Sequence, residues 1–360
     1  MVTPPLDVRT LLDRQLLLKR SGMSAEDAVA HLLGLQSQTP TSPYPGLWTR
    51  LDGFDFAELG RLLTERRAVR LALMRSTVHL VTSADALRLR HWIGPMLERS
   101  FLGSQWAKGL AGTGRAELEE YARALLREKP RTPAELRDGF AARFPEADPA
   151  SLVNALRSWM PLAQLPPRGV WGAGGAPEYG LLEDWLGEPF TPPDPRDLVR
   201  RYLAAYGPAG PADMQKWCGL TGLKAVFAGM DLRTHTAQDG RVLHDLPDAV
   251  LTDPSVPVPA RFVADFDNAL LSHADRSRIL PEAHRTRVMT VNGIVRGTIL
   301  VDGFVAGTWR FDRAKGSAAV AVTHFTVLSA ADRDALTGEG LRLLAAADPG
   351  AAHDVTFTAG

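Results

Sequence analysis

The sequence predicts an α+β chain in which three helix-rich units precede a small strand-rich domain. Three observations support this prediction. First, stretches with apolar residues at helical spacing occur in groups of three. Second, each group is followed by two short stretches with the pattern of β-strands. Third, dipeptides typical of hairpin turns are concentrated near the C-terminus. Three helices followed by a β-hairpin is the order of a winged-helix domain, and its repetition indicates a tandem array.

The first unit spans residues 1–113. Its second helix has an N-terminal cap candidate in Ser24, with Asp27 three residues further on. Strands are predicted over 68–75 and 77–81, and the segment 83–85 starts a further helix. The three helices preceding these strands are predicted over residues 7–20, 24–35 and 55–67.

The next two units repeat the pattern. In the unit 114–190, Thr132-Pro133 and Asp148-Pro149 each place a cap and a proline at the start of a helix. A proline-rich linker, 189–195, precedes the unit 191–256, whose hairpin turns at Asp239-Gly240. The predicted helices are 115–129, 132–142, 149–160, 196–206, 211–218 and 220–230, and the strands 162–165, 170–179, 232–237 and 241–246.

The last domain, 257–360, is predicted to be a small β domain with a terminal helix. Its strands are separated by Asn292-Gly293, Asp302-Gly303 and Lys315-Gly316, and Asn-Gly and Asp-Gly favour the tight turns of hairpins. The strands themselves are predicted over 287–291, 295–301, 304–310 and 318–327.

Length and composition limit the class of protein. A chain of 360 residues, 45% of them apolar, predicts two to four globular domains. It has no apolar run long enough to cross a membrane and no N-terminal signal segment, so we expect a cytoplasmic protein. The single cysteine, Cys218, excludes internal disulfides, multi-cysteine zinc sites and four-cysteine iron–sulfur clusters.

The formal net charge is zero, but the charges are segregated along the chain. Residues 61–90 hold seven arginines against two acids, a local charge of +5, and residues 272–298 hold five against two, a local charge of +3. Such runs are either solvated faces or phosphate-binding surfaces. The sequence has none of the nucleophile-elbow, phosphate-loop or zinc-helix motifs of common enzymes.

Gln36 and Gln38 are the most informative candidates for a site. Pro40 disfavours helix at Thr39, and Gly34 weakens the preceding turn, so the two glutamines are predicted to emerge side by side on extended chain. Two amides placed in this way can share one water molecule. The alternative is a helix C-cap.

Four segments resemble the winged-helix DNA glycosylases of the AlkZ/YcaQ superfamily, and the resemblance covers essentially the whole chain. They are LLGLQSQ at 32–38, MRSTVHLV at 74–81, FDN with DRSR within 266–278, and VDG with GTWR within 301–310. The AlkZ branch carries a Gln-apolar-Gln motif, whereas the YcaQ branch has aspartate as the second polar residue. Here the motif is Gln36-Ser37-Gln38, so its central serine departs from the apolar pattern of the AlkZ branch.

The resemblance implies tandem winged-helix domains and a small β-barrel-like domain in a C-shaped clamp. It also implies that Gln36 and Gln38 are catalytic in a monofunctional glycosylase that excises alkylated purines, including bulky adducts or cross-links, and leaves an abasic site. A purine alkylated at N7 or N3 is already a cationic leaving group, so the enzyme needs only to place water and to stabilise a cationic sugar. No cofactor is required, and self-resistance to a DNA-alkylating antibiotic is a conceivable role.

This interpretation implies that the partner is duplex DNA carrying alkylated purines and that the protein acts at the nucleoid. We expect a monomer, because a clamp around a duplex needs no symmetry. Alternation on a strand predicts one shared face for Arg75, Thr77 and His79, where they either contact DNA or form a structural network. Arg276 and Arg278 either bind phosphate or pair with Asp275 or Asp267. The remaining candidates are Arg296 and Arg310 for DNA, and Tyr44 and Trp48 either for lining the lesion site or for packing the loop.

Two interpretations from other classes remain open at this point. A non-catalytic winged-helix transcriptional regulator would use the same basic segments to bind DNA, and a protein-interaction array would bind none. The two DNA-binding interpretations make different predictions for a variant in which both glutamines are replaced by alanine. An enzyme would lose base release and keep DNA binding, whereas a regulator would show no change or a change in affinity only.

Overall fold

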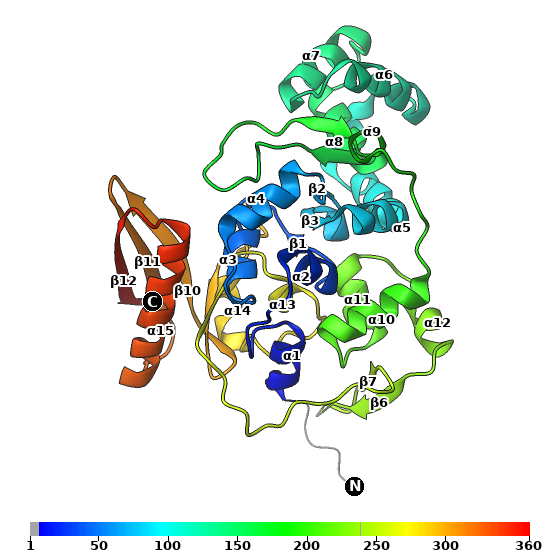
Figure 1. Ribbon diagram of the computed structural model, residues 1–360. Coiled ribbons are helices and arrows are strands. Elements are labelled where there is room, and N and C mark those ends of the chain that lie inside the picture. Colours follow the sequence, from blue (N-terminus) through cyan, green and yellow to red (C-terminus); the bar gives the residue numbers. More distant parts are fainter. Residues whose placement is uncertain (1–6, 238) are drawn as a thin grey trace.

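The computed structural model describes residues 7–237 and 239–360 and shows an α+β fold (Figure 1). The predicted cap of the second helix is confirmed, because Ser24 accepts a hydrogen bond from the Asp27 amide. The first helix ends at Arg14, earlier than predicted, since Leu16 turns into the left-handed region and the chain then buries Leu17. The N-terminal helices are α1 (Val8–Arg14), α2 (Ala25–His31), α3 (Pro43–Trp48) and α4 (Phe56–Thr64).

One five-stranded sheet joins the first two predicted units, in the order β1-β3-β2-β4-β5. Its central pairing, β2 with β3, is the predicted first hairpin, and β2 also pairs with β4 across the boundary expected at residue 113. The long strand predicted over 170–179 is wrong, because only its last residue enters β5. The strands are β1 (Leu35–Gln36), β2 (Ala68–Ala72), β3 (Val78–Thr82), β4 (Leu162–Gln164) and β5 (Tyr179–Leu181).

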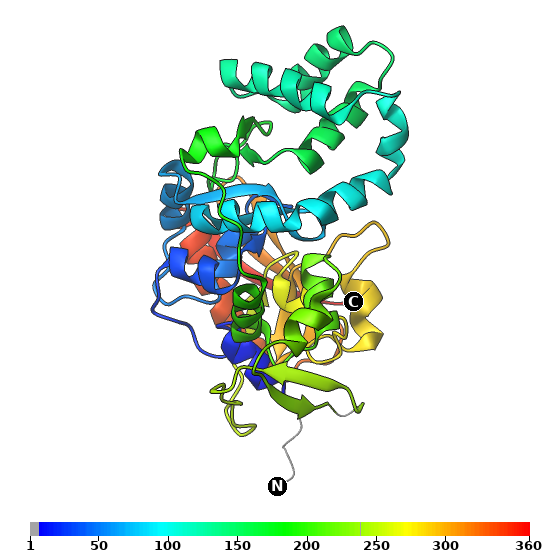
Figure 2. The same cartoon turned by 90° about the vertical axis from the view of Figure 1, so that its right-hand side faces the viewer.

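The helices of the second unit stand at one end of the molecule, with α6 and α7 furthest from the C-terminal sheet (Figures 1 and 2). Thr132 and Asp148 cap α7 and α8, and a proline follows each cap as predicted. The helical elements from the end of the first unit through the second are α5 (Ser83–Leu102), η2 (Gln105–Leu110), α6 (Arg115–Glu128), α7 (Pro133–Arg143), α8 (Pro149–Trp159) and α9 (Leu182–Leu186).

The third unit matches its predicted order of three helices and a hairpin. Residue 238, which follows the predicted strand 232–237, lies outside the described residues. The elements are α10 (Pro195–Tyr206), α11 (Pro211–Cys218), α12 (Leu223–Ala228), β6 (Arg233–Thr236) and β7 (Val242–Asp245).

The C-terminal sheet is open, with the order β12-β11-β10-β9-β8, so within the described residues the expected barrel is not closed. The strand predicted over 287–291 is wrong, because a single helical turn, α14 (Arg285–Val288), buries Val288 there. A strand also follows the helix expected to end the chain. The elements are β8 (Arg261–Val263), α13 (Asn268–Leu271), η3 (Glu282–His284), β9 (Thr298–Val301), β10 (Phe304–Ala314), β11 (Ser317–His324), α15 (Ala330–Ala347) and β12 (Ala352–Ala359).

Three of the four hydrophobic cores in the described residues cross the boundaries of the predicted units, whereas the fourth lies almost entirely within the second unit. One core packs α2, α3 and α4 against the C-terminal sheet and α15, and another packs α1 against β8, α13 and β9. A third core joins β2 and α5 to α10 and α11. The segments around the two glutamines are therefore held between parts of the chain that are distant in sequence. No helix in the described ranges combines the length and the apolar character needed to span a membrane.

Candidate active site

The glutamine pair follows a sharp turn at the end of α2. Leu33 and Gly34 both take positive φ, and a Cβ at Gly34 would lie 2.5 Å from the Val81 side chain, so only glycine fits. The chain then enters β1, where Gln36 pairs with His79 of β3. The predicted extended backbone at Gln36 is confirmed, although the helix ends four residues earlier than expected.

Gln36 is 6% exposed and is held by an arginine. The Nη2 group of Arg75 donates to Gln36 Oε1 at 2.8 Å and to Asn268 Oδ1 at 3.0 Å. Asn268 in turn donates to the Gly34 carbonyl at 3.0 Å. Because a guanidinium has only donors, it selects the amide rotamer that directs Oε1 toward Arg75. The second lone pair of that oxygen and the amide NH2 remain for a substrate or water.

Arg75 does not lie on a strand, so the predicted shared strand face of Arg75, Thr77 and His79 is wrong. Arg75 takes φ 57° within η1 (Met74–Ser76), and its Nη1 donates to the Trp217 carbonyl at 2.6 Å. Thr77 donates to the Met74 carbonyl within the same turn. Burial lowers the pKa of Arg75 to about 10, which still leaves the side chain charged at neutral pH. Arg75, which is half-buried, therefore places a positive charge beside Gln36.

His79 is fully buried next to this charge. Its Nδ1 donates to the Thr77 carbonyl at 3.1 Å, and its Nε2 accepts from Arg75 Nη2 at 3.3 Å. This arrangement requires the neutral imidazole, because the protonated ring has no acceptor. Burial and the Arg75 charge lower the pKa of His79 to about 3. His79 therefore supports Arg75 and is neutral throughout the physiological pH range.

Gln38 is exposed, and its Oε1 accepts a hydrogen bond from the Val78 amide at 3.3 Å. Between the glutamines, Ser37 is completely buried. Arg70 of β2 donates from Nε to Ser37 Oγ at 2.9 Å and from Nη2 to the Ser37 carbonyl at 3.0 Å. The serine that departs from the apolar pattern is thus the hydrogen-bonding partner of a buried arginine.

Tyr44 and Trp48 pack into the protein around α3. The Tyr44 hydroxyl donates to the Gly169 carbonyl at 2.8 Å and accepts from the Trp171 amide at 2.9 Å, and burial raises its pKa to about 12. Trp48 is 8% exposed, with the guanidinium of Arg20 stacked 4.5 Å from its ring centre. Neither aromatic residue is among those that line the cavity beside the motif.

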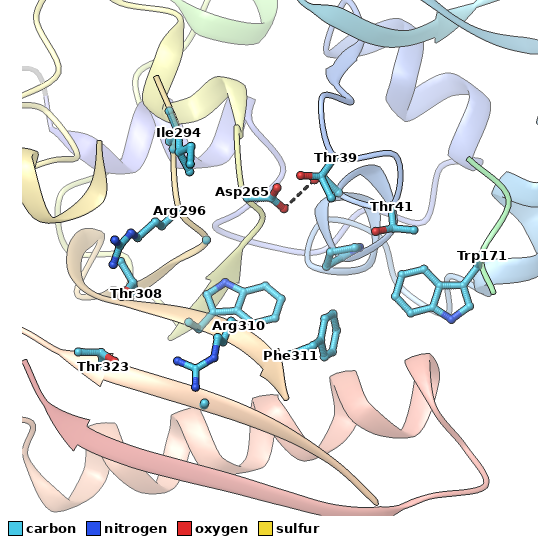
Figure 3. A pocket seen from close by; sticks show the side chains of 16 residues that line it. Thr39, Thr41, Trp171, Asp265, Ile294, Arg296, Thr308, Arg310, Phe311 and Thr323 are labelled. Carbon is cyan, nitrogen blue, oxygen red and sulfur yellow. Dashed lines mark hydrogen bonds between the residues drawn. The ribbon is translucent and has the colours of Figure 1, made fainter. Parts of the chain in front are cut away.

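That cavity, of about 410 Å³, opens between the loop after Gln38 and the C-terminal sheet (Figure 3). Thr39, which follows Gln38 directly, belongs to its wall. Arg296 and Arg310, both predicted to bind DNA, also line it and are exposed. The other lining side chains include Asp265, Trp171, Trp309 and Phe311.

Arg276 and Arg278 are half-buried and pair with neither predicted acid. Arg278 donates to the Pro208 carbonyl at 3.0 Å, and Arg276 contacts the Met289 sulfur at 3.4 Å. The two acids are bound elsewhere, Asp275 by Arg241 and Asp267 by Arg50. The turn of the β9–β10 hairpin at Asp302 and Gly303 packs on α1.

Sequence reasoning missed Arg70, Asn268 and Asp265 as parts of the site. Arg70 carried a signal, since it is a lone charge within the apolar strand Ala68–Ala72. Asn268 lies in one of the segments that carry the family resemblance. No local pattern marks Asp265, because its neighbours in the cavity come from distant segments of the chain.

Comparisons with known proteins identify the family of the chain and a solved structure with the same fold. The family model described as DNA glycosylase AlkZ-like matches residues 29–346. The interstrand DNA cross-link repair glycosylase of Streptomyces sahachiroi is 27% identical over 331 residues, which cover 83% of this chain and 85% of that protein. The solved structure of the Streptomyces sahachiroi DNA glycosylase AlkZ aligns over 98% of both chains with a TM-score of 0.78 at 20% identity, and so shares the fold.

The fold and the match to the family model define a hydrolase of the DNA glycosylase class, which acts on the N-glycosidic bond. The chain belongs to the AlkZ-like DNA glycosylase family.

Proposed function

We propose that this protein is a monofunctional glycosylase that excises alkylated purines from duplex DNA, including N7-alkylguanine, N3-alkyladenine and bulky adducts or cross-links. The name of the Streptomyces sahachiroi relative, a cross-link repair glycosylase, supports the bulky substrates and is consistent with genotoxin resistance as a role. The observation that carries the proposal is the pair of glutamine amides two residues apart, Gln36 fixed in β1 and Gln38 exposed just after it.

The arrangement fits the chemistry of a cationic leaving group. An alkylated purine departs without prior protonation, so no strong acid is needed beside the base. Each glutamine Oε1 accepts one hydrogen bond from the protein and keeps a second lone pair, which can orient a water toward C1′. The carbonyl dipoles also favour the positive charge that develops on the sugar. Arg75 prevents Gln36 from turning its oxygen away.

We further propose that the helix and hairpin units are three winged-helix domains that form a C-shaped clamp around the duplex as a monomer. Arg296 and Arg310, exposed beside the motif, are the cations best placed to contact phosphate. Family membership does not favour the alternative of a transcriptional regulator without catalytic activity.

The test measures free base released from duplex DNA that contains N7-methylguanine. We expect the wild type to release base and the Gln36→Ala/Gln38→Ala variant to be slower by at least about 100-fold, because the groups that orient water are removed. Gln105→Ala, at an exposed glutamine of η2, serves as the matched control and should keep the wild-type rate.

DNA binding is measured in parallel as a function of salt concentration, to distinguish the glycosylase from the regulator and from a protein-interaction array. Equal release by the wild type and the double variant would refute the catalytic assignment. Binding without release from methylated or bulky-adduct DNA would favour the regulator.

A further inference from the structure

A second recess in the surface lies between the segment after α1, the end of α3 and the helix α15. It consists of two adjoining pockets of about 570 and 310 Å³, which share Arg20 and Asp52. None of the described residues that line these pockets also lines the cavity beside Gln38, and none belongs to the arginine-rich segments 61–90 and 272–298. We call the two pockets together the α15 groove. The roles assigned so far do not involve it.

Positive charge is concentrated in the α15 groove. Its lining contains four cations, Lys19, Arg20, Arg261 and Arg342. Behind them, the buried carboxylate of Glu339 accepts hydrogen bonds from Arg20 at 2.6 Å, from Arg342 at 2.6 Å and from Arg261 at 3.4 Å. Three guanidinium groups thus share a single buried carboxylate, although the formal net charge of the whole chain is zero.

Two of these arginines are fixed in place and still have donors to spare. Arg20 Nε donates to the Trp48 carbonyl at 3.2 Å, and Arg261 Nε donates to the Leu17 carbonyl at 2.9 Å. Nη1 of Arg20 and Nη2 of Arg261 have no hydrogen-bond partner among the described residues, and neither is a buried unpaired atom, so both are accessible to solvent. Burial and the charges of Arg20 and Arg342 lower the pKa of Arg261, against the opposing effect of Glu339. An additional anion would relieve this crowding of positive charge.

Apolar groups line the α15 groove beside the cations. The run 257–259, Pro-Val-Pro, belongs to the larger pocket and is exposed or half-buried, and Trp48 and Phe54 belong to the smaller pocket. The guanidinium of Arg20, which both pockets share, stacks 4.5 Å from the centre of the Trp48 ring. A ligand that carries both carboxylates and apolar side chains therefore matches this lining better than a bare anion does.

Asp52 favours a peptide over nucleic acid as the occupant. Its carboxylate is exposed and lines both pockets. A phosphodiester backbone offers no hydrogen-bond donor and is repelled by this charge, whereas the backbone N–H groups of a peptide can donate to it.

We propose that the α15 groove binds an acidic peptide segment of a partner protein, with the carboxylates of the peptide at the four cations and its apolar side chains against the run 257–259. Complementarity of charge carries this inference, because the groove has a surplus of fixed guanidinium donors and a peptide carboxylate accepts two of them at once. The site would attach the enzyme to another protein, and it does not depend on the proposed substrate.

The experiment measures the fluorescence anisotropy of a labelled peptide of alternating acidic and apolar residues, Asp-Phe-Asp-Leu-Asp-Phe, in the presence of the whole chain. We expect the wild type to bind it and Lys19→Glu/Arg342→Gln to bind it about tenfold more weakly or worse, because charge-assisted hydrogen bonds are lost. Both of these cations are exposed, so Arg20 and Arg261 remain to pair with Glu339. The control Lys224→Glu/Arg137→Gln makes the same change of charge at exposed residues of α12 and α7 and should bind like the wild type.

Two altered peptides test the chemistry of the ligand on the wild type, without any variant of the protein. Asparagine replaces every aspartate in one, and serine replaces every apolar residue in the other; each should bind about tenfold more weakly or worse. Equal binding of either altered peptide, no binding of the original one, or unchanged binding by Lys19→Glu/Arg342→Gln would overturn the inference.

A short undamaged duplex is added as a competitor to distinguish a peptide site from a nucleic-acid surface. We expect Lys19→Glu/Arg342→Gln to bind this duplex as the wild type does and to keep the wild-type urea midpoint. If the duplex displaces the peptide and loses as much affinity as the peptide does in this variant, the groove binds nucleic acid and the proposal is wrong.

Discussion

Removing the Ser37 hydroxyl should expose how far the motif depends on Arg70. Ser37 is 0% exposed and Arg70 is 1% exposed. Arg70 donates one hydrogen bond to the Ser37 hydroxyl at 2.9 Å and another to the Ser37 carbonyl at 3.0 Å. The third guanidinium nitrogen, Nη1, is buried without a partner among the described residues. In Ser37→Ala, the guanidinium therefore keeps one bond in a site from which water is excluded.

The magnitude follows from these contacts. Loss of one hydrogen bond to a buried charged group costs about 1.5–3 kcal/mol of the free energy of unfolding. Arg70 is poorly solvated because it is buried, and this burial lowers its pKa to about 10. Arg70→Met removes that charge, so Ser37→Ala/Arg70→Met should be more stable than the sum of the single changes predicts, by about 1–3 kcal/mol.

Urea unfolding of the four proteins measures this coupling, and single-turnover base release measures its effect on the motif. We expect Arg70→Met to slow release, because the Ser37 backbone between the two glutamines loses its anchor. Arg88→Met, at an exposed arginine of α5, is the control and should change stability by less than about 0.5 kcal/mol. Strictly additive effects of the two single changes would refute the reasoning.

Two further predictions concern the support of the site. Arg50→Met should reduce the free energy of unfolding by about 3–5 kcal/mol, because it leaves the buried Asp267 carboxylate unpaired; a loss below about 1 kcal/mol in urea unfolding would contradict this. For His79, the pKa of about 3 in the folded state lies below the ordinary 6.5, so the unfolded chain binds more protons between these values. Stability should therefore be constant above pH 6.5 and fall as the pH drops from 6.5 toward 3, by up to ~1.4 kcal/mol per pH unit. His79→Gln should show a shallower fall in the urea midpoint, and an unchanged slope would exclude His79 as the cause.

Local signals explain the parts of the fold that were predicted correctly. The cap at Ser24 and the prolines after Thr132 and Asp148 act within one helical turn, so their effect is readable without any tertiary contact. The turn at Asp302-Gly303 is equally local, since both residues take the positive φ that a tight hairpin requires. The strand β12 was missed because it pairs in parallel with β11 across an intervening helix.

The sequence by itself determined that the chain would leave the helix before Gln36 and become extended there, because Gly34 acts on its own backbone. The tertiary structure decided what surrounds them. Arg75 turns inward to partners 142 and 193 residues away, Trp217 and Asn268. The cavity likewise gathers side chains from segments far apart in the sequence, within residues 39–45, 171, 265, 294–297, 308–311 and 321–323. Such contacts depend on how the hydrophobic cores pack against one another, and this packing leaves no periodic pattern in the sequence.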